Sequence, residues 1–154
     1  MTGIVLIAHA PLASALESCV EHVYTCEPGM ARANVRALDV PPGARIEDLQ
    51  QRARQLVKEV DSGAGVLVLT DAFGATPGNL AAQLNDPGRV SVVAGVNLPM
   101  LLRAVCYREG SLADVAEKAL AGGQQGMMQV VSTPVQNQGY KPQGDDQQRL
   151  HHQQ

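Results

Sequence analysis

A histidine and an aspartate in this sequence each stand directly after a short apolar run. His9 follows residues 4–8, and Asp71 follows residues 66–70. If the two runs are neighbouring strands of a parallel sheet, both side chains lie at the edge of the sheet where ligands bind. A carboxylate hydrogen-bonded to one ring nitrogen fixes the imidazole tautomer and leaves the other nitrogen free to attack an electrophile. In the alternative interpretation, His9 only ends a strand and Asp71 makes an Asx turn.

The segment after Asp71 has the composition of a loop that can hold an anion. Gly74, Ala75 and Thr76 offer main-chain amides and one hydroxyl, and a proline that suits a helix start follows them. Together with the free amides at the start of the helix after His9, they could hold a phosphoryl group. The loop lacks the Gly-Lys-Ser/Thr of a Walker A motif. No GxGxxG follows the first strand and no GxSxG is present, which disfavours a dehydrogenase and a serine hydrolase.

Alternating strands and helices are needed to position these residues. Four apolar runs have the character of buried parallel strands, at residues 4–8, 35–40, 66–70 and 90–94. Segments with helical spacing lie at about 12–23, 45–61, 80–84, 100–108 and 111–121. This alternation predicts an α/β fold: an open, mostly parallel four-stranded sheet with helices on both faces. Residues 127–131 could add a last strand, which Gly122 and Gly123 separate from the preceding helix.

Length and composition predict one folded domain followed by a tail. The chain has 154 residues, 45% of them hydrophobic, which is enough for one domain with its own core. We expect this domain to span residues 1–132. Residues 133–154 are rich in glutamine and poor in apolar side chains, so they are predicted to be disordered.

Charge, aromatic content and cysteine pattern exclude several classes of function. The net charge is -3 and aromatic residues make up 3% of the chain, whereas nucleic-acid binding favours basic surfaces and stacked rings. The apolar stretch at the start, residues 4–8, is too short to cross a bilayer, so we expect a soluble, cytoplasmic protein. The three cysteines form no CxxC pair, and neither a metal site nor a cofactor is expected.

Three segments lie in a distinctive order along the chain. The first strand runs into a histidine as Ile-Val-Leu-Ile-Ala-His at 4–9. The third strand ends in Asp-Ala-Phe-Gly-Ala-Thr-Pro-Gly-Asn at 71–79, and a Gly-Val-Asn-Leu-Pro-Met run occupies 95–100. With these motifs the chain resembles the IIA component of the mannose-type sugar phosphotransferase system over residues 1–132. Two positions depart from the family pattern: Ala10 replaces a common glycine, and Ala72 replaces a residue that often carries a hydroxyl.

The resemblance implies a phosphocarrier in which His9 is phosphorylated and Asp71 orients it. Such a protein accepts its phosphoryl group from the phosphocarrier protein HPr and passes it to a IIB component, here on a separate chain. Contact with the membrane would be made only through a separate permease. Members are usually homodimers that exchange their last strand, so residues 127–131 are expected to form a C-terminal edge strand exchanged in a dimer.

Docking of a donor protein would need an apolar rim around His9. Phe73, Leu98 and Met100 are the candidates for this rim. Met100 could equally pack inside its own helix, as methionine commonly does. The rim is therefore expected to be formed by residues from two different loops.

Two other functions of the same site stay open. One is a regulatory phosphoprotein of an incomplete phosphotransferase system, in which phosphorylation changes a contact surface. The other is the phosphotransfer subunit that serves dihydroxyacetone kinase. The run at residues 95–99 favours the mannose type, and the sequence does not name a sugar.

Overall fold

Four parallel strands form one sheet in the computed structural model, which describes residues 1–24 and 34–131. The strands stand in the order β2-β1-β3-β4. Their bounds are β1 (Gly3–His9), β2 (Val35–Val40), β3 (Val66–Thr70) and β4 (Val90–Ala94). This order makes β1 the neighbour of both β2 and β3, so the end of β1 is flanked on each side by another strand end. The predicted open parallel sheet is confirmed.

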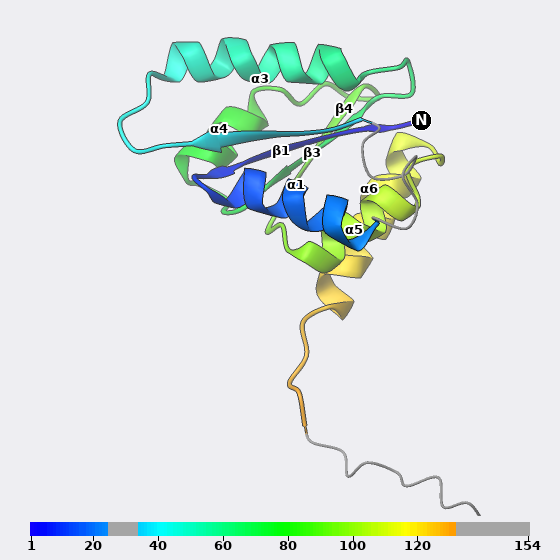
Figure 1. Ribbon diagram of the computed structural model, residues 1–154. Helices are drawn as coiled ribbons and strands as arrows, with labels where there is room; N and C mark the ends of the chain where they lie inside the picture. Colours follow the sequence, from blue (N-terminus) through cyan, green and yellow to red (C-terminus); the bar gives the residue numbers. More distant parts are fainter. Residues whose placement is uncertain (25–33, 132–154) are drawn as a thin grey trace, which may run out of the picture.

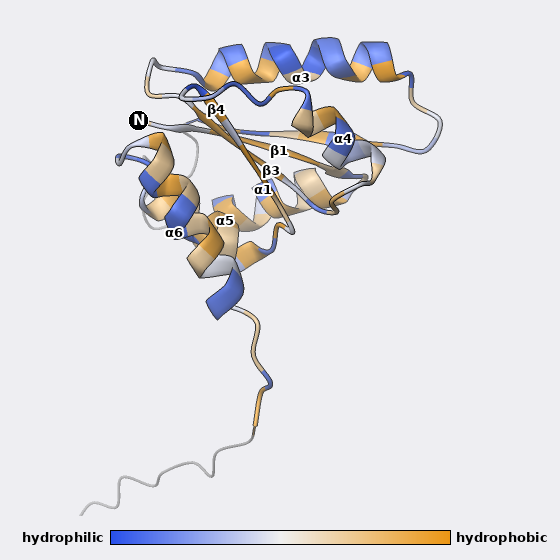
Figure 2. Cartoon of the chain, turned by 180° about the vertical axis from the view of Figure 1, so that it is seen from behind, coloured by the Kyte–Doolittle hydropathy of each residue, from blue (hydrophilic) through white to orange (hydrophobic). Residues whose placement is uncertain are grey.

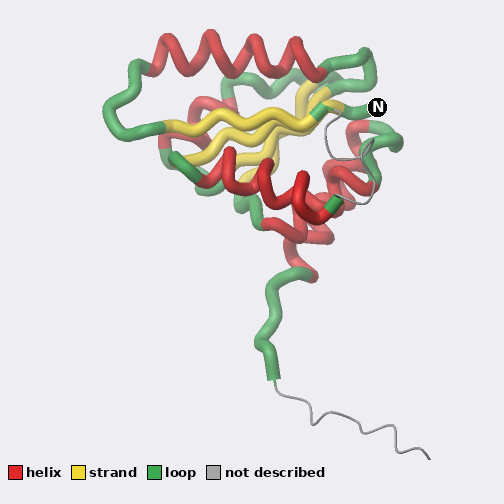
Figure 3. Tube along the Cα trace, viewed as in Figure 1, coloured by secondary structure: helices red, strands yellow, loops and turns green. Residues whose placement is uncertain are grey.

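Helices cover both faces of the sheet (Figure 1). α3 (Ile46–Val60) and α4 (Thr76–Ala82) lie on one face. The other face carries α1 (Leu12–Val23), α5 (Leu98–Cys106) and α6 (Leu112–Gln125). The surface helix α3 turns its hydrophobic side to the sheet and its hydrophilic side outward (Figure 2), and the three layers are clear in the tube view (Figure 3).

The sheet divides the core into two parts. Ile4 and Leu6 of β1 pack toward α1, α5 and α6, whereas Val5 and Ile7 pack toward α3 and α4. All four side chains are fully buried. Each such burial contributes about 1.5–3 kcal/mol, and a strand covered on both faces needs a continuous apolar sequence. His9, which ends β1, therefore follows a strand that is buried on both faces.

Two helices begin earlier than the sequence pattern predicts. α4 begins at Thr76 and α5 at Leu98, so that Pro77 and Pro99 lie inside the first turn. A proline fits there because a first-turn N–H has no partner within the helix. The apolar spacing predicts these two helices at about residues 80–84 and 100–108, although Pro77 is expected to suit a helix start.

Gly122 and Gly123 lie within α6 and do not separate it from a following element, so the predicted break is wrong. A Cβ at Gly122 would lie 2.6 Å from the Cβ of Arg103, and one at Gly123 would lie 2.7 Å from the Cε of Met100. The two glycines therefore let α6 pack directly against α5. Close packing of the two helices explains their place in a helix that they would otherwise weaken.

Residues 127–131 form no strand within the single chain that the structure describes. Their side chains Met127, Met128, Val130 and Val131 are 69–89% exposed. Pairing of this segment with a second subunit stays a prediction. The predicted tail at 133–154 lies outside the described residues, and within them no helix is long and apolar enough to span a membrane.

Candidate functional site

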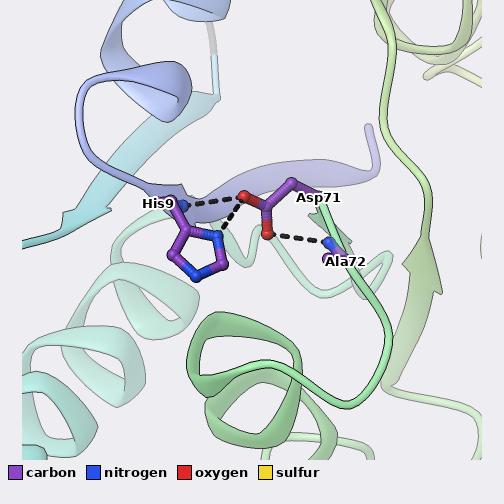
Figure 4. A network of polar contacts seen from close by, with 3 residues as sticks. All are labelled: His9, Asp71 and Ala72. Carbon is purple, nitrogen blue, oxygen red and sulfur yellow. Dashed lines mark hydrogen bonds and ion pairs between the residues drawn. The ribbon is translucent and has the colours of Figure 1, made fainter.

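His9 and Asp71 meet at the carboxyl edge of the sheet (Figure 4). His9 is the last residue of β1, and Asp71 follows the neighbouring strand β3. Nδ1 of His9 lies 2.7 Å from Oδ2 of Asp71, and the His9 main-chain N–H donates to the same oxygen at 2.9 Å. Oδ1 of Asp71 accepts a hydrogen bond from the Ala72 N–H at 2.8 Å. The two side chains expected to meet at the strand ends do so.

The surroundings of Asp71 favour its ionised form. Burial raises the pKa of Asp71, but hydrogen bonds from the His9 main chain, the His9 ring and the Ala72 main chain lower it by more, so the pKa lies below its usual value. An ionised carboxylate can only accept hydrogen bonds, so the ring donates through Nδ1–H. The lone pair of a neutral ring is then on Nε2, which points away from Asp71 in Figure 4, and the His9 side chain is 55% exposed.

An open pocket of about 510 Å³ adjoins His9. Its walls come from the end of β1, the loop between β2 and α3, and the first turns of α3 and α4. The lining residues are His9, Ala10, Val40, Pro41, Pro42, Gly43, Ala44, Ile46, Leu49 and Thr76. Thr76, predicted to contact a phosphoryl group, thus shares a pocket with the exposed histidine. In the part of the chain described, no group of three or more His, Cys, Asp and Glu side chains could hold a metal ion.

The loop between β3 and α4 is fixed by its own contacts. Gly74 has a φ of +83°, and a Cβ at Gly78 would lie 2.5 Å from the carbonyl oxygen of Ala72. Both positions therefore need glycine, the first for its conformation and the second for space. The Asn79 side chain donates to the Gly74 carbonyl at 3.4 Å. Gly74 and Ala75, the other predicted phosphoryl-binding residues, belong to this loop but do not line the pocket.

The third sequence motif, residues 95–100, contacts the main chain next to Asp71. After β4, the Gly95 N–H donates to the carbonyl of Asp71 at 3.1 Å, and the Val96 N–H donates to the carbonyl of Thr70 at 3.0 Å. Asn97 then caps α5 by accepting a hydrogen bond from a main-chain N–H of the first turn. The motif thus holds the main chain of the loop that carries the aspartate.

The three predicted docking residues have different surroundings. Phe73 is 94% exposed, so its ring is available to a partner. Leu98 is half-buried and packs against the core beneath α5 and α6. Met100 is only 4% exposed, and its assignment to the docking rim is wrong. The reason is the close pairing of α5 with α6, which takes the Met100 side chain into the core.

One of the first-turn amides of α1, expected from the sequence to be free for an anion, is already used. The Ser14 N–H donates to Oδ1 of Asp39 at 3.1 Å, and the Ser14 hydroxyl donates to Oδ2 at 2.6 Å. The carboxylate of Asp39, from β2, therefore binds the third residue of this helix. Sequence analysis missed Asp39, although an acidic residue within an otherwise largely apolar strand was a usable signal.

Fold and site together define a class of protein: an open parallel α/β domain that presents an aspartate-held histidine at the carboxyl edge of its sheet. The model of the EIIA-man family, described as PTS system fructose IIA component, matches residues 3–120. The chain belongs to this family. Its relatives include mannose-, fructose- and sorbose-specific components of the phosphotransferase system.

Individual relatives cover different shares of the chain. It is 30% identical over 112 residues to the PTS system mannose-specific EIIAB component of Escherichia coli K12, covering 71% of this chain and 35% of that protein. It is 37% identical over 94 residues to the PTS system fructose-specific EIIA component of Bacillus subtilis 168, covering 60% and 64%. The chain thus spans less than two thirds of either relative.

A solved structure shows the same fold. The chain superposes on the mannose/sorbose-specific IIA subunit of the phosphotransferase system from Enterococcus faecalis with a TM-score of 0.73. The superposition covers 87% of this chain and 98% of that one, at 20% sequence identity. At this identity the likeness establishes the fold of the chain and not its substrate.

Proposed function

We propose that this chain is a phosphocarrier that accepts a phosphoryl group on Nε2 of His9. The observation that carries the proposal is the 2.7 Å contact between Nδ1 of His9 and Asp71. This contact fixes one ring nitrogen as a donor and leaves the other directed away from the carboxylate (Figure 4). Membership of a family of phosphotransferase-system components supports the same chemistry independently.

The proposed transfer exchanges one nitrogen–phosphorus bond for another. The Nε2 lone pair of His9 attacks phosphorus in line while the bond to the donor's phosphohistidine breaks, and the electron pair of that bond returns to the donor ring. The His9 ring becomes cationic, and the Asp71 carboxylate stabilises this charge through Nδ1–H. The Thr76 hydroxyl and the main-chain amides of Gly74 and Ala75 then stabilise the phosphoryl oxygens.

The proposed partners are the phosphocarrier protein HPr as donor and a IIB component on a separate chain as acceptor. The name of the Escherichia coli relative joins A and B components, which supports an acceptor of this kind. Phe73, 94% exposed on the loop after Asp71, is the first candidate for a docking contact, with Leu98 as a lesser one. We place this activity in the cytoplasm, which agrees with the free thiols of Cys19 and Cys106.

Phosphorylation in a defined mixture tests this function. The purified protein is incubated with enzyme I, HPr and labelled phosphoenolpyruvate, and an acid-labile label is expected on the wild type. His9→Ala should remove the label, whereas His22→Ala, which changes the second histidine of the first 24 residues, should keep it. An unlabelled wild type, or a labelled His9→Ala variant, would contradict the proposal.

We also propose that the chain forms a homodimer by exchanging residues 127–131. These residues form no strand in the single chain, yet they carry four exposed apolar side chains, which supports pairing with a second subunit. Light scattering of the full chain should give twice the monomer mass. Replacing Val130 and Val131 by lysine should give the monomer mass, and a wild type already monomeric would refute the dimer.

A further inference from the structure

The carboxylate of Asp39 ties the first turn of α1 to strand β2. Both of its oxygens are used by Ser14, one by the main-chain N–H at 3.1 Å and one by the hydroxyl at 2.6 Å. The two residues are 25 positions apart in the chain, and both are half-buried. A carboxylate at a helix N-terminus satisfies amides that have no partner within the helix and interacts favourably with the helix dipole.

The contact between Asp39 and Ser14 is close to His9 in the sequence and in the sheet. In the ladder between β1 and β2, Ala8 stands opposite Asp39 and His9 stands opposite Val40. The Ala10 N–H also donates to the Val40 carbonyl at 3.1 Å. Strand β2 therefore holds the chain both directly after His9 and again at the first turn of α1, and the segment between these points has little freedom to move.

Residues from both strands next to β1, namely β2 and the end of β3, therefore hold His9 and the residues after it. On the β3 side, Asp71 binds both the His9 ring and the His9 main-chain N–H. On the β2 side, Asp39 and Val40 fix the residues that follow His9. A ring held at one nitrogen keeps its direction only if the main chain that carries it is also fixed, and small misplacements of a reacting group slow transfer strongly.

We propose that Asp39 is a positioning residue for phosphoryl transfer at His9, acting through Ser14 and the first turn of α1. It fixes the main chain on the β2 side as Asp71 fixes the ring on the β3 side. The expected effect of Asp39 on the transfer rate rests on the proposed function. Its expected effect on the His9 ring in the unphosphorylated protein does not depend on that function.

Three variants separate this role from a general loss of stability. Asp39→Ala removes both contacts to Ser14, and Asp39→Asn keeps an oxygen that can accept a hydrogen bond. Asp114→Ala is the matched control, because Ser111 and Asp114 form the same pair of groups at the same 2.6 Å at the start of α6. Ser14→Ala removes the hydroxyl contact to Asp39, and with it the 3.1 Å contact of the same hydroxyl to the Pro11 carbonyl. It keeps the main-chain contact to Asp39, so it keeps the test open if Asp39→Ala does not fold.

The rate experiment uses phosphorylated HPr as donor and measures kcat and KM for label transfer to the full chain. Asp39→Ala should lower kcat about fivefold to tenfold with KM unchanged, as expected for a displaced acceptor. Asp39→Asn and Asp114→Ala should stay within about twofold of wild type, and Ser14→Ala should fall between. A normal kcat in both Asp39→Ala and Ser14→Ala, or an equal loss in Asp114→Ala, would overturn the proposal.

A measurement without donor follows the ring itself. In the wild type, the ¹⁵N chemical shifts of His9 should show a protonated Nδ1 and a bare Nε2. In Asp39→Ala, or in Ser14→Ala if the former does not fold, the two shifts should move toward a common value, while Asp114→Ala should leave them unchanged. Unchanged shifts in the first two variants would overturn the role of Asp39. A wild type that takes no phosphoryl group would instead refute the proposed function, and the ring shifts would still decide the role of Asp39.

Discussion

The β1–α1 and β3–α4 junctions look alike in sequence but differ in what their helix starts contact. Each joins a buried strand to a helix through a short loop with a proline near the helix start. At the first junction, Asp39 occupies the first turn of α1 through Ser14. At the second, among the residues that the structure describes, no side-chain oxygen from another strand accepts from the start of α4, and Thr76 opens onto the pocket beside His9.

This difference shows how a histidine can be held firmly while space for an anion is kept beside it. The first junction carries His9, the proposed nucleophile, and the Asp39 carboxylate binds Ser14 in the first turn of its helix. The second carries Asp71, which contacts the His9 ring, and the Thr76 side chain that lines the pocket beside His9. A phosphoryl group on His9 is therefore expected to be stabilised from the β3–α4 side.

The largest effect on transfer is expected from removing the contact that joins the two junctions. Asp71→Ala leaves Nδ1 of His9 without its acceptor, so the ring can rotate and change tautomer. Phosphorylation by the donor should slow at least about tenfold, since an orienting carboxylate commonly contributes that much. Stopped-flow or quench kinetics with matched circular dichroism spectra give the measurement. Wild-type rates in a folded Asp71→Ala variant would show that the contact has no role in transfer.

Distorting the β3–α4 junction should have the next largest effect on the transfer rate. Gly78→Ala places a Cβ 2.5 Å from the Ala72 carbonyl oxygen, so the loop that offers the amides must move. We expect a loss of about threefold to tenfold in kcat, because positioned amide donors lose effect when they are displaced. Gly88→Ala is the control: its φ of +83° makes the substitution strained, but it has open space and lies outside the pocket. An equal rate loss in both variants would argue against the loop as a phosphoryl site.

Phe73 and Met100, both predicted as docking residues, should affect different properties of the protein: Phe73 its affinity for the donor and Met100 its stability. Phe73→Ala should raise the KM for the donor about threefold or more without lowering the free energy of unfolding, because the ring is 94% exposed. Met100→Ala should lower the free energy of unfolding by about 2–5 kcal/mol, as core truncations do, with KM unchanged. Urea unfolding and steady-state kinetics on both variants test the pair. An unchanged KM in Phe73→Ala would remove the only strongly exposed docking candidate.

The smallest expected effect is a pH dependence of stability that originates at Asp71. The pKa of this carboxyl is lowered from its ordinary 3.8 in the folded protein, so the unfolded state binds more protons near that pH. Its contribution is complete above the ordinary value and is lost as the pH falls through the folded one. The difference in unfolding free energy between wild type and Asp71→Asn should therefore shrink below about pH 4. A difference that stays constant down to about pH 3 would contradict the lowered pKa.

Much of this site could be predicted from the sequence because its main parts follow strand ends. Four apolar runs gave the sheet, and the parallel arrangement then brought the residues after β1 and β3 to one edge. The contact between Asp39 and Ser14 could not be predicted, because the two residues are 25 positions apart. The acidic residue within β2 marked Asp39 as unusual but did not indicate its partner. Gly122, Gly123 and Met100 were misassigned for a related reason: their surroundings are set by the packing of α5 on α6, which local periodicity does not report.

The position of the phosphoryl group on the His9 ring decides whether Nε2 is the acceptor. The ¹⁵N-labelled chain is phosphorylated through enzyme I and HPr, and ¹⁵N–³¹P couplings are measured for its histidine rings. We expect phosphorus on Nε2 of His9, with Nδ1 still protonated and held by Asp71. Phosphorus on Nδ1 of His9, or on any other residue, would contradict it.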